Sequence, residues 1–121
     1  MENHTKLGVL KTRSEFLHVR SGKHRAFKNL VIQANANPSS GAIRVGFTAT
    51  KKIGNAVVRN KAKRRLRHVA RELLPEHGLK GVDYVFIARN STASTPYKSL
   101  ISNTRDALAS IPQINKKVSK S

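Results

Sequence analysis

The carboxylates of this chain are too few and too scattered to build a hydrolytic metal centre. Only six occur among 121 residues: Glu2, Glu15, Glu72, Glu76, Asp83 and Asp106. Two-metal hydrolysis of a phosphodiester needs several carboxylates that converge on ions about 4 Å apart. The chain also has no cysteine, which excludes thiol catalysis, disulfides and thiolate zinc sites. We therefore expect no catalytic residue and no metal ligand.

Histidines offer a second route to catalysis, because an acid–base pair of histidines beside a lysine could cleave RNA without a metal. The histidines outside the N-terminal tail are His18, His24, His68 and His77. None of them belongs to a pattern such as HExxH, and isolated histidines in a basic protein more often lie on the surface or contact RNA. A metal-free nuclease stays open as an alternative.

The strongest chemical signal lies between residues 51 and 71, which hold many basic residues and no acid. The basic residues are Lys51, Lys52, Arg59, Lys61, Lys63, Arg64, Arg65, Arg67 and Arg71. Like charges at i,i+4 spacing destabilise a helix, so we expect compensation from another molecule. Phosphates of a nucleic acid would provide it through ion pairing and counterion release. The alternative is a solvated face that keeps the protein soluble, although mixed charges would serve solubility equally well.

The whole chain is strongly basic, with 24 lysines and arginines, a formal net charge of +18 and a pI of about 11.5. Its length suits one domain, which we place at residues 9–111 between a tail at 1–8 and a basic tail at 112–121. No apolar stretch is long enough for a signal peptide or a membrane span. We expect a cytoplasmic protein with no membrane partner.

The basic residues must be positioned by a helix, because residues 55–74 have helical periodicity. At 100° per residue one apolar stripe forms, comprising Ala62, Leu66, Val69, Ala70 and Leu73. Asn55 is the expected N-cap and Pro75 the expected end. The basic side chains then occupy the remaining arc of the helix surface.

Patterns around this helix predict an α/β domain. A capping box from Thr12 to Glu15 predicts a helix over about 13–21, ended by Gly22. Residues 28–36 and 43–50 alternate in hydropathy and predict an antiparallel pair of strands.

The C-terminal half of the domain predicts one more strand and one more helix. Residues 82–88 are apolar on both faces, as in a central strand. Thr95 and Pro96 predict the start of a helix that ends near residue 110.

Charge alone does not separate RNA from DNA as a partner, since a basic helix could enter a major groove. There is no helix-turn-helix partner, zipper or zinc site, and a helix packed on a sheet suits RNA modules better. We expect RNA and no DNA. A ribosomal or ribonucleoprotein assembly factor would suit the same charge and remains an alternative.

A specific motif adds to this interpretation. The segment from Val45 to Arg67 resembles the signature of the bacterial ribonuclease P protein family, whose core is Arg-Asn-x-x-Lys-Arg-x-x-Arg. Here that core is Arg59, Asn60, Lys63, Arg64 and Arg67. The strand after it and the first helix with Phe16 match as well, so the resemblance covers about residues 7–110.

The resemblance implies a two-layer α/β (α+β) sandwich with a small mixed sheet of three to four strands. The implied order is helix, strands, basic helix, strand, helix. The crossover that carries the basic helix is left-handed in this family, an exception to the usual handedness.

The resemblance also implies an accessory function in tRNA 5′ maturation. A large RNA would hydrolyse precursor tRNA with Mg²⁺, and this protein would bind that RNA, about one to one, and the precursor. The side chains expected to meet the catalytic RNA are Lys51, Lys52, Arg59, Asn60, Lys61, Lys63, Arg64, Arg67 and Arg71.

The single-stranded 5′ leader would lie in a cleft between the first helix and the sheet. An aromatic ring there can stack on a base while basic groups follow the phosphates. The expected leader contacts are Phe16, Arg20, Gln33 and Thr48. Arg20 and Gln33 stand where the family often has aromatic residues, and Phe16 could instead serve packing alone.

Overall fold

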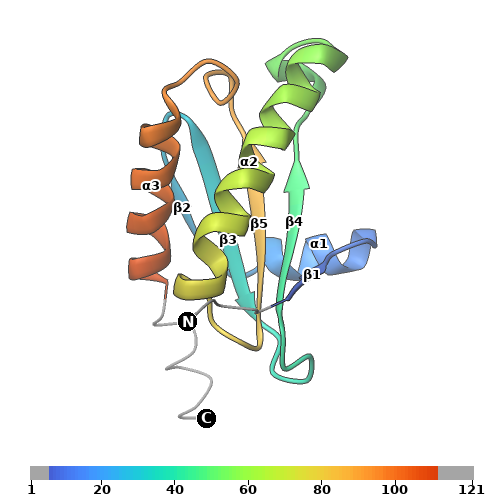
Figure 1. Ribbon diagram of the computed structural model, residues 1–121. Helices are drawn as coiled ribbons and strands as arrows, with labels where there is room; N and C mark the ends of the chain where they lie inside the picture. Colours follow the sequence, from blue (N-terminus) through green and yellow to red (C-terminus); the bar gives the residue numbers. More distant parts are fainter. Residues whose placement is uncertain (1–5, 112–121) are drawn as a thin grey trace.

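The computed structural model describes residues 6–111, which form one sheet with three α-helices packed on it (Figure 1). The expected tail 112–121 lies outside the described residues, and the expected tail 1–8 overlaps the first strand at Leu7 and Gly8. The elements in chain order are β1 (Leu7–Val9), α1 (Arg13–Arg20), β2 (Lys23–Ala26), β3 (Leu30–Ala36), β4 (Ile43–Thr48), the 3₁₀ turn η1 (Lys51–Ile53), α2 (Ala56–His77), β5 (Val82–Ala88) and α3 (Tyr97–Ser110).

The sheet has five strands in the order β1-β4-β5-β3-β2, rather than the three to four that we expected. The two unpredicted strands, β1 and β2, are short and lie at opposite edges. The residues of β2 are all exposed and carry no apolar alternation, so β2 forms because it pairs with β3. Edge strands of this kind depend on a longer neighbour more than on their own sequence.

The predicted antiparallel pair between residues 28–36 and 43–50 is wrong. β5 lies between β3 and β4, antiparallel to β3 and parallel to β4. Every residue of β5 is buried except the partly buried Ile87. A strand that is apolar on both faces gains most when it has a neighbour on each side and helices on each face. β5 therefore takes the centre, as its own pattern predicted, and separates β3 from β4.

The connection from β4 through α2 to β5 is left-handed, as the family resemblance implied. In Figure 1, α2 descends in front of the sheet, both strands run upward, and β5 lies to the left of β4. A right-handed connection would place β5 to the right. General rules of strand connection would have predicted the opposite hand.

Alternate residues of β5 face two different layers. Tyr84 and Phe86 join the main core beneath α2 and α3, whereas Val85 packs with Leu10 and Val19 beneath α1. Burial raises the pKa of the Tyr84 hydroxyl to about 12, and this hydroxyl accepts a hydrogen bond from the Leu79 amide at 2.9 Å.

Two helix boundaries differ from their predictions. α2 continues through Pro75 to His77, and the Gly78 amide closes the last turn on the Leu74 carbonyl at 2.8 Å. A proline this near the C-terminal end removes one helical hydrogen bond without ending the helix. α3 has Pro96 as its N-cap rather than Thr95, and no side chain caps the helix, because the proline ring carries no hydrogen-bond acceptor.

The first helix ends close to its prediction. Ser21 is the C-cap, and Gly22 follows it at a close approach to β3. A Cβ atom on Gly22 would lie 2.2 Å from the Ala34 carbonyl oxygen, so only glycine fits there.

Candidate nucleic-acid interface

α2 has one apolar and one basic side, as its periodicity predicted. Its buried residues are Ala62, Leu66, Val69, Ala70, Leu73 and Leu74. The Asn55 side-chain oxygen accepts a hydrogen bond from the Val58 amide at 3.0 Å, which confirms the expected N-cap. Packing and capping together hold the other side of the helix toward solvent.

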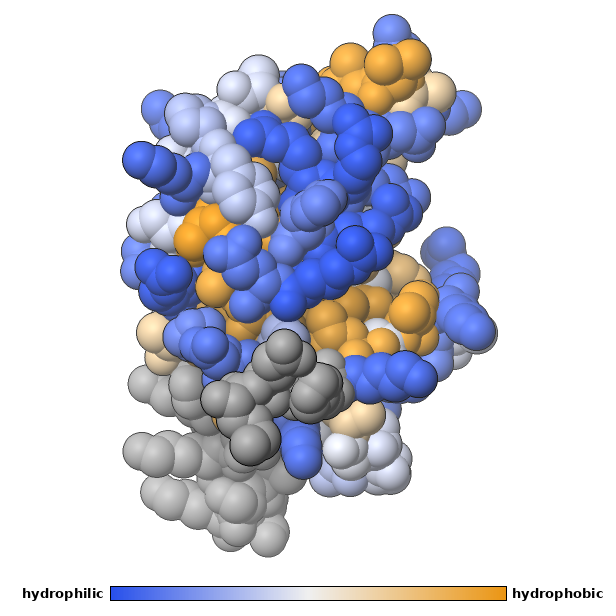
Figure 2. Space-filling view, in the orientation of Figure 1, coloured by the Kyte–Doolittle hydropathy of each residue, from blue (hydrophilic) through white to orange (hydrophobic). Residues whose placement is uncertain are grey.

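We call this outward side, together with η1, the basic face. Its members are Lys51, Lys52, Arg59, Asn60, Lys61, Lys63, Arg64, Arg67 and Arg71. All are exposed except Arg59 and Lys63, which are partly buried. Figure 2 shows a hydrophilic band along α2 that crosses the molecule. The structure thus brings all of the predicted contacts with the catalytic RNA together on one surface.

The described residues leave the charge of the basic face uncompensated. The ion pairs within residues 6–111 join Arg44 to Glu15 and Asp83, and His77 to Glu76. Arg65 belongs to the same run but points elsewhere, since it donates to the Thr92 carbonyl at 2.6 Å. A dense positive surface of this kind attracts polyanions at long range.

A second surface, which we call the α1 groove, lies between α1 and the adjacent sheet face. It encloses about 670 Å³, and all four predicted leader contacts line it: Phe16, Arg20, Gln33 and Thr48. They come from α1, β3 and β4, which are distant in sequence. The groove has apolar walls and cationic ends, a combination that suits single-stranded nucleic acid.

Phe16 lies directly over Gly46 of β4. A Cβ atom on Gly46 would come within 2.6 Å of the Phe16 Cζ atom, so the ring occupies space that any other residue would fill. Phe16 is partly buried, packs against the small cluster of Leu10, Val19 and Val85, and lines the α1 groove. Packing and groove lining are therefore served by the same ring, and the two interpretations of Phe16 do not exclude each other.

The sequence analysis missed several residues of the α1 groove. Arg13 and Leu17 lie on α1 beside Phe16, and Val85 and Ile87 form the floor from β5. The spacing of Arg13, Phe16 and Arg20 on one helix face was visible in the sequence. The contribution of β5 was not visible, because it depends on the position of β5 between β3 and β4.

An ion-pair cluster, which we call the Arg44 clamp, ties α1 to the sheet. The Arg44 guanidinium donates to both carboxylate oxygens of the buried Asp83, at 2.9 and 2.7 Å, and to Glu15 at 3.1 Å. Asn37 donates to Asp83 at 3.1 Å. The hydrogen bond to Asp83 is the main cause that raises the pKa of Arg44 above its ordinary value, so the guanidinium keeps its charge.

Glu15 joins the Arg44 clamp to the start of α1. It closes the predicted capping box with Thr12, and it accepts hydrogen bonds from the Lys11 and Thr12 amides at 2.6 and 2.9 Å. The bond from Thr12, then that from Lys11, and then the charge of Arg44 lower the pKa of Glu15 to about 2. One carboxylate therefore both caps α1 and anchors it to β4.

Two of the groups considered for catalysis have other partners. His18 lies 2.9 Å from the Ala36 carbonyl oxygen, and Glu72 accepts a hydrogen bond from the Tyr97 hydroxyl at 3.1 Å. Within residues 6–111, no group of three or more histidine, aspartate or glutamate side chains is arranged to hold a metal ion. Among the described helices, none combines the length and hydropathy that crossing a bilayer requires.

Comparison with known proteins finds relatives that match most of this chain. The chain is 47% identical over 105 residues to the ribonuclease P protein component of Ruegeria pomeroyi, with 84% of each chain covered. It is 39% identical over 118 residues to that of Paramagnetospirillum magneticum, covering 92% of this chain and 87% of the relative.

A solved structure shares the fold. The ribonuclease P protein of Staphylococcus aureus superposes with a TM-score of 0.71 at 26% identity, covering 86% of this chain and 94% of that one. The family model described as Ribonuclease P matches residues 5–112, which is nearly the whole chain. The chain therefore belongs to the ribonuclease P protein family.

Proposed function

We propose that this protein is the subunit of ribonuclease P that enables a catalytic RNA to remove 5′ leaders from precursor tRNAs. The observation that carries the proposal is the α1 groove, lined by all four predicted leader contacts, in a chain of this family that also carries the basic face. One surface would bind the catalytic RNA and the other the leader. The chemistry stays with the RNA, and no residue of this chain is assigned a catalytic part.

The contribution of the basic face is electrostatic. Two RNAs repel each other, and a face of uncompensated cations lowers that repulsion where they meet. Lys51 and Lys52 extend the face beyond the N-terminus of α2, on η1. Binding of this kind depends steeply on salt and little on sequence.

The contribution of the α1 groove is positional. A leader base stacks on Phe16, while Arg13 and Arg20 neutralise phosphates along α1. Gln33 offers an amide to a base edge, and Thr48 offers a hydroxyl. Holding the leader places the scissile phosphate at the Mg²⁺ ions of the catalytic RNA, which converts a loose encounter into an oriented one.

The remaining partners follow from this function. We expect about one protein per catalytic RNA, in the cytoplasm, with precursor tRNA as substrate and no DNA partner. Mg²⁺ is required by the RNA component, and we assign no Mg²⁺ ligand to the protein.

The test is cleavage of a 5′-labelled precursor tRNA at low millimolar Mg²⁺. Three reactions are compared: the protein alone, the large RNA alone, and both together. We expect efficient cleavage only with both, and a fall in the protein's contribution as salt rises.

Other outcomes would overturn the proposal. Cleavage by the protein alone would move the chemistry onto its histidines and carboxylates. Binding of RNA without cleavage in any mixture would favour a ribosomal or ribonucleoprotein assembly factor instead.

A further inference from the structure

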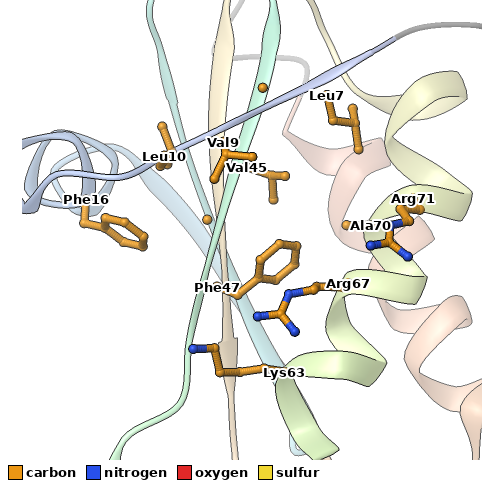
Figure 3. Close-up of a pocket in the computed structure, with 12 residues that line it drawn as sticks. Leu7, Val9, Leu10, Phe16, Val45, Phe47, Lys63, Arg67, Ala70 and Arg71 are labelled. Atoms are coloured by element: carbon orange, nitrogen blue, oxygen red, sulfur yellow. The ribbon is translucent and has the colours of Figure 1, made fainter. Parts of the chain in front are cut away.

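A pocket of about 390 Å³ lies at the β1 edge of the sheet, where α1, β4 and α2 meet (Figure 3). We call it the edge pocket. Val45, Phe47 and Ala70 line it from the sheet and from α2, and Val9 lines it from β1. Val9 is 61% exposed, so an apolar side chain that lies beside this pocket remains open to solvent. The volume lies in the range of small-molecule sites.

The rim of the edge pocket is cationic. Lys63, Arg67 and Arg71 reach it from α2, and no acidic residue among residues 6–111 lines it. The Arg67 guanidinium lies 5.8 Å from the centroid of the Phe47 ring. Apolar walls below a rim of three cations fit a flat apolar group that carries a negative charge.

The edge of β4 adds polar groups to the same place. β1 pairs with β4 only up to Val9 and Val45, and the Leu10 amide donates to the Val45 carbonyl at 3.1 Å. Alternate residues of a strand direct their N–H and C=O groups to the same edge, so those of Phe47 also face this edge. Among residues 6–111, no strand pairs with β4 there. A base with donors and acceptors on its rim can use these groups.

The edge pocket also joins the two surfaces described above. Phe16 lines both the edge pocket and the α1 groove, and Lys63 and Arg67 belong to the basic face. Figure 3 shows Phe16 and Phe47 on either side of β4. A nucleotide held here would lie where the catalytic RNA and the leader approach each other.

We propose that the edge pocket binds one unpaired nucleotide of RNA, with its base against Phe47 and Val9 and its phosphate on the cations of the rim. This inference rests on the proposed function, because it names a contact within the same RNA interface. The nucleotide can come from the catalytic RNA or from the leader, and the chemistry of recognition is the same for both.

The test is an NMR titration of the full chain with AMP and, separately, with inorganic phosphate. We expect AMP to shift the methyl signals of Val9, Val45 and Ala70, which phosphate alone leaves in place. Val9→Glu puts a negative charge at the mouth and weakens AMP binding about fivefold or more. Ala109→Glu adds the same charge on the exposed side of α3 and leaves AMP binding unchanged.

Two results would overturn the proposal that the edge pocket binds a nucleotide. One is that AMP and phosphate shift the same signals, and the other is that the two glutamate variants weaken AMP binding equally. Cleavage assays on the same proteins separate this from failure of the proposed function. If the wild-type holoenzyme cleaves precursor tRNA but AMP does not bind in the edge pocket, only the proposal for the pocket is wrong. If AMP binds in the edge pocket but no mixture cleaves precursor tRNA, the proposed function is wrong and the proposal for the pocket is supported.

The same variants identify the source of the nucleotide. If Val9→Glu weakens assembly with the catalytic RNA, the nucleotide belongs to that RNA. If it weakens only the binding of leader-bearing substrate, the nucleotide belongs to the leader. Either result supports the pocket, whereas unchanged assembly and unchanged substrate binding would contradict it.

Discussion

The two faces of the sheet are covered in different ways. On one face, α2 and α3 bury a continuous apolar core around Phe86 and Leu66. On the other face, the only described helix that lies on the sheet is the eight-residue α1, held by the small cluster around Val19 and by the Arg44 clamp. The first face supports a rigid helix whose outer side is the basic face. The second leaves part of the sheet open as the α1 groove.

This difference relates stability to function. A broad apolar layer supplies most of the free energy of folding and needs no open surface. A face that must receive a ligand cannot be filled, so α1 is anchored by directed ion pairs at one end and leaves a groove beside Phe16. Substitutions on the two faces should therefore separate stability from leader binding.

The largest effect is expected from truncation in the main core. Leu66→Ala should lower the free energy of unfolding by about 3 kcal/mol, because it leaves a cavity beneath α2. Leu17→Ala on the exposed side of α1 is the matched control and should cost less than about 1 kcal/mol. Urea unfolding of both variants measures the difference. Equal losses would contradict the contrast between the two faces.

The next largest effect concerns the Arg44 clamp. Asp83→Asn should lower the free energy of unfolding by about 2 kcal/mol, because it removes the buried charge beside Arg44. This loss is smaller than for a fully buried ion pair, since Arg44 retains some contact with solvent. Asp106→Asn on the exposed side of α3 serves as the control. Thermal and urea unfolding report the loss. An Asp83→Asn variant as stable as the control would show that the ion pair between Arg44 and Asp83 makes no net contribution to stability.

Leader binding should respond to the ring of Phe16. Phe16→Ala should weaken the affinity of the holoenzyme for leader-bearing precursor about tenfold, the effect of one lost base stack. Affinity for mature tRNA, which lacks the leader, should stay nearly unchanged. Equal losses for both RNAs would assign Phe16 to packing over Gly46.

The salt dependence of RNA binding should change when an arginine of the basic face is removed. Arg64→Ala should lower the slope of log affinity against log salt for the catalytic RNA by about 1, the loss of one phosphate contact. Its unfolding should match that of the wild type, because Arg64 is exposed. Arg105→Ala on α3 is the matched control. A lower unfolding midpoint with an unchanged salt slope would make Arg64 structural.

The smallest effect is expected at acid pH. The pKa of Glu15 is lowered from its ordinary value near 4.5 to about 2, so the carboxylate stabilises the fold above pH 4.5. That stabilisation is lost as the pH falls toward 2, because the folded protein then takes up the proton. Glu15→Gln should flatten this part of the stability curve, measured by urea unfolding between pH 5 and pH 2. If Glu15→Gln leaves the pH dependence of the unfolding free energy between pH 5 and pH 2 unchanged, Glu15 makes no net contribution to stability.

Much of the candidate site could be predicted from the sequence. The capping box at Thr12, the Asn55 cap and the apolar stripe of α2 depend on residues a few positions apart, and the structure confirms each of them. The grouping of those members of the basic face that lie on α2 follows from the helix period alone. The α1 groove was predicted in a different way, since its four predicted residues came from the family resemblance.

Pairing of the strands could not be predicted from local pattern. Hydropathy alternation predicts that residues 28–36 and 43–50 are strands, but it contains nothing about a third strand that lies between them. β1 has three residues and β2 has four, which is too short for either to show a pattern. The hand of the crossover is likewise a property of the whole sheet.

The sequence by itself determined the helices, the basic face and the membership of an RNA-binding family, because these depend on neighbours along the chain or on a continuous motif. Only the tertiary structure decided the place of β5, the floor of the α1 groove and the existence of the edge pocket. The edge pocket joins Val9, Phe16, Phe47 and Arg67 from four elements. Residues so far apart meet only through long-range packing, and no local pattern along the chain encodes that packing.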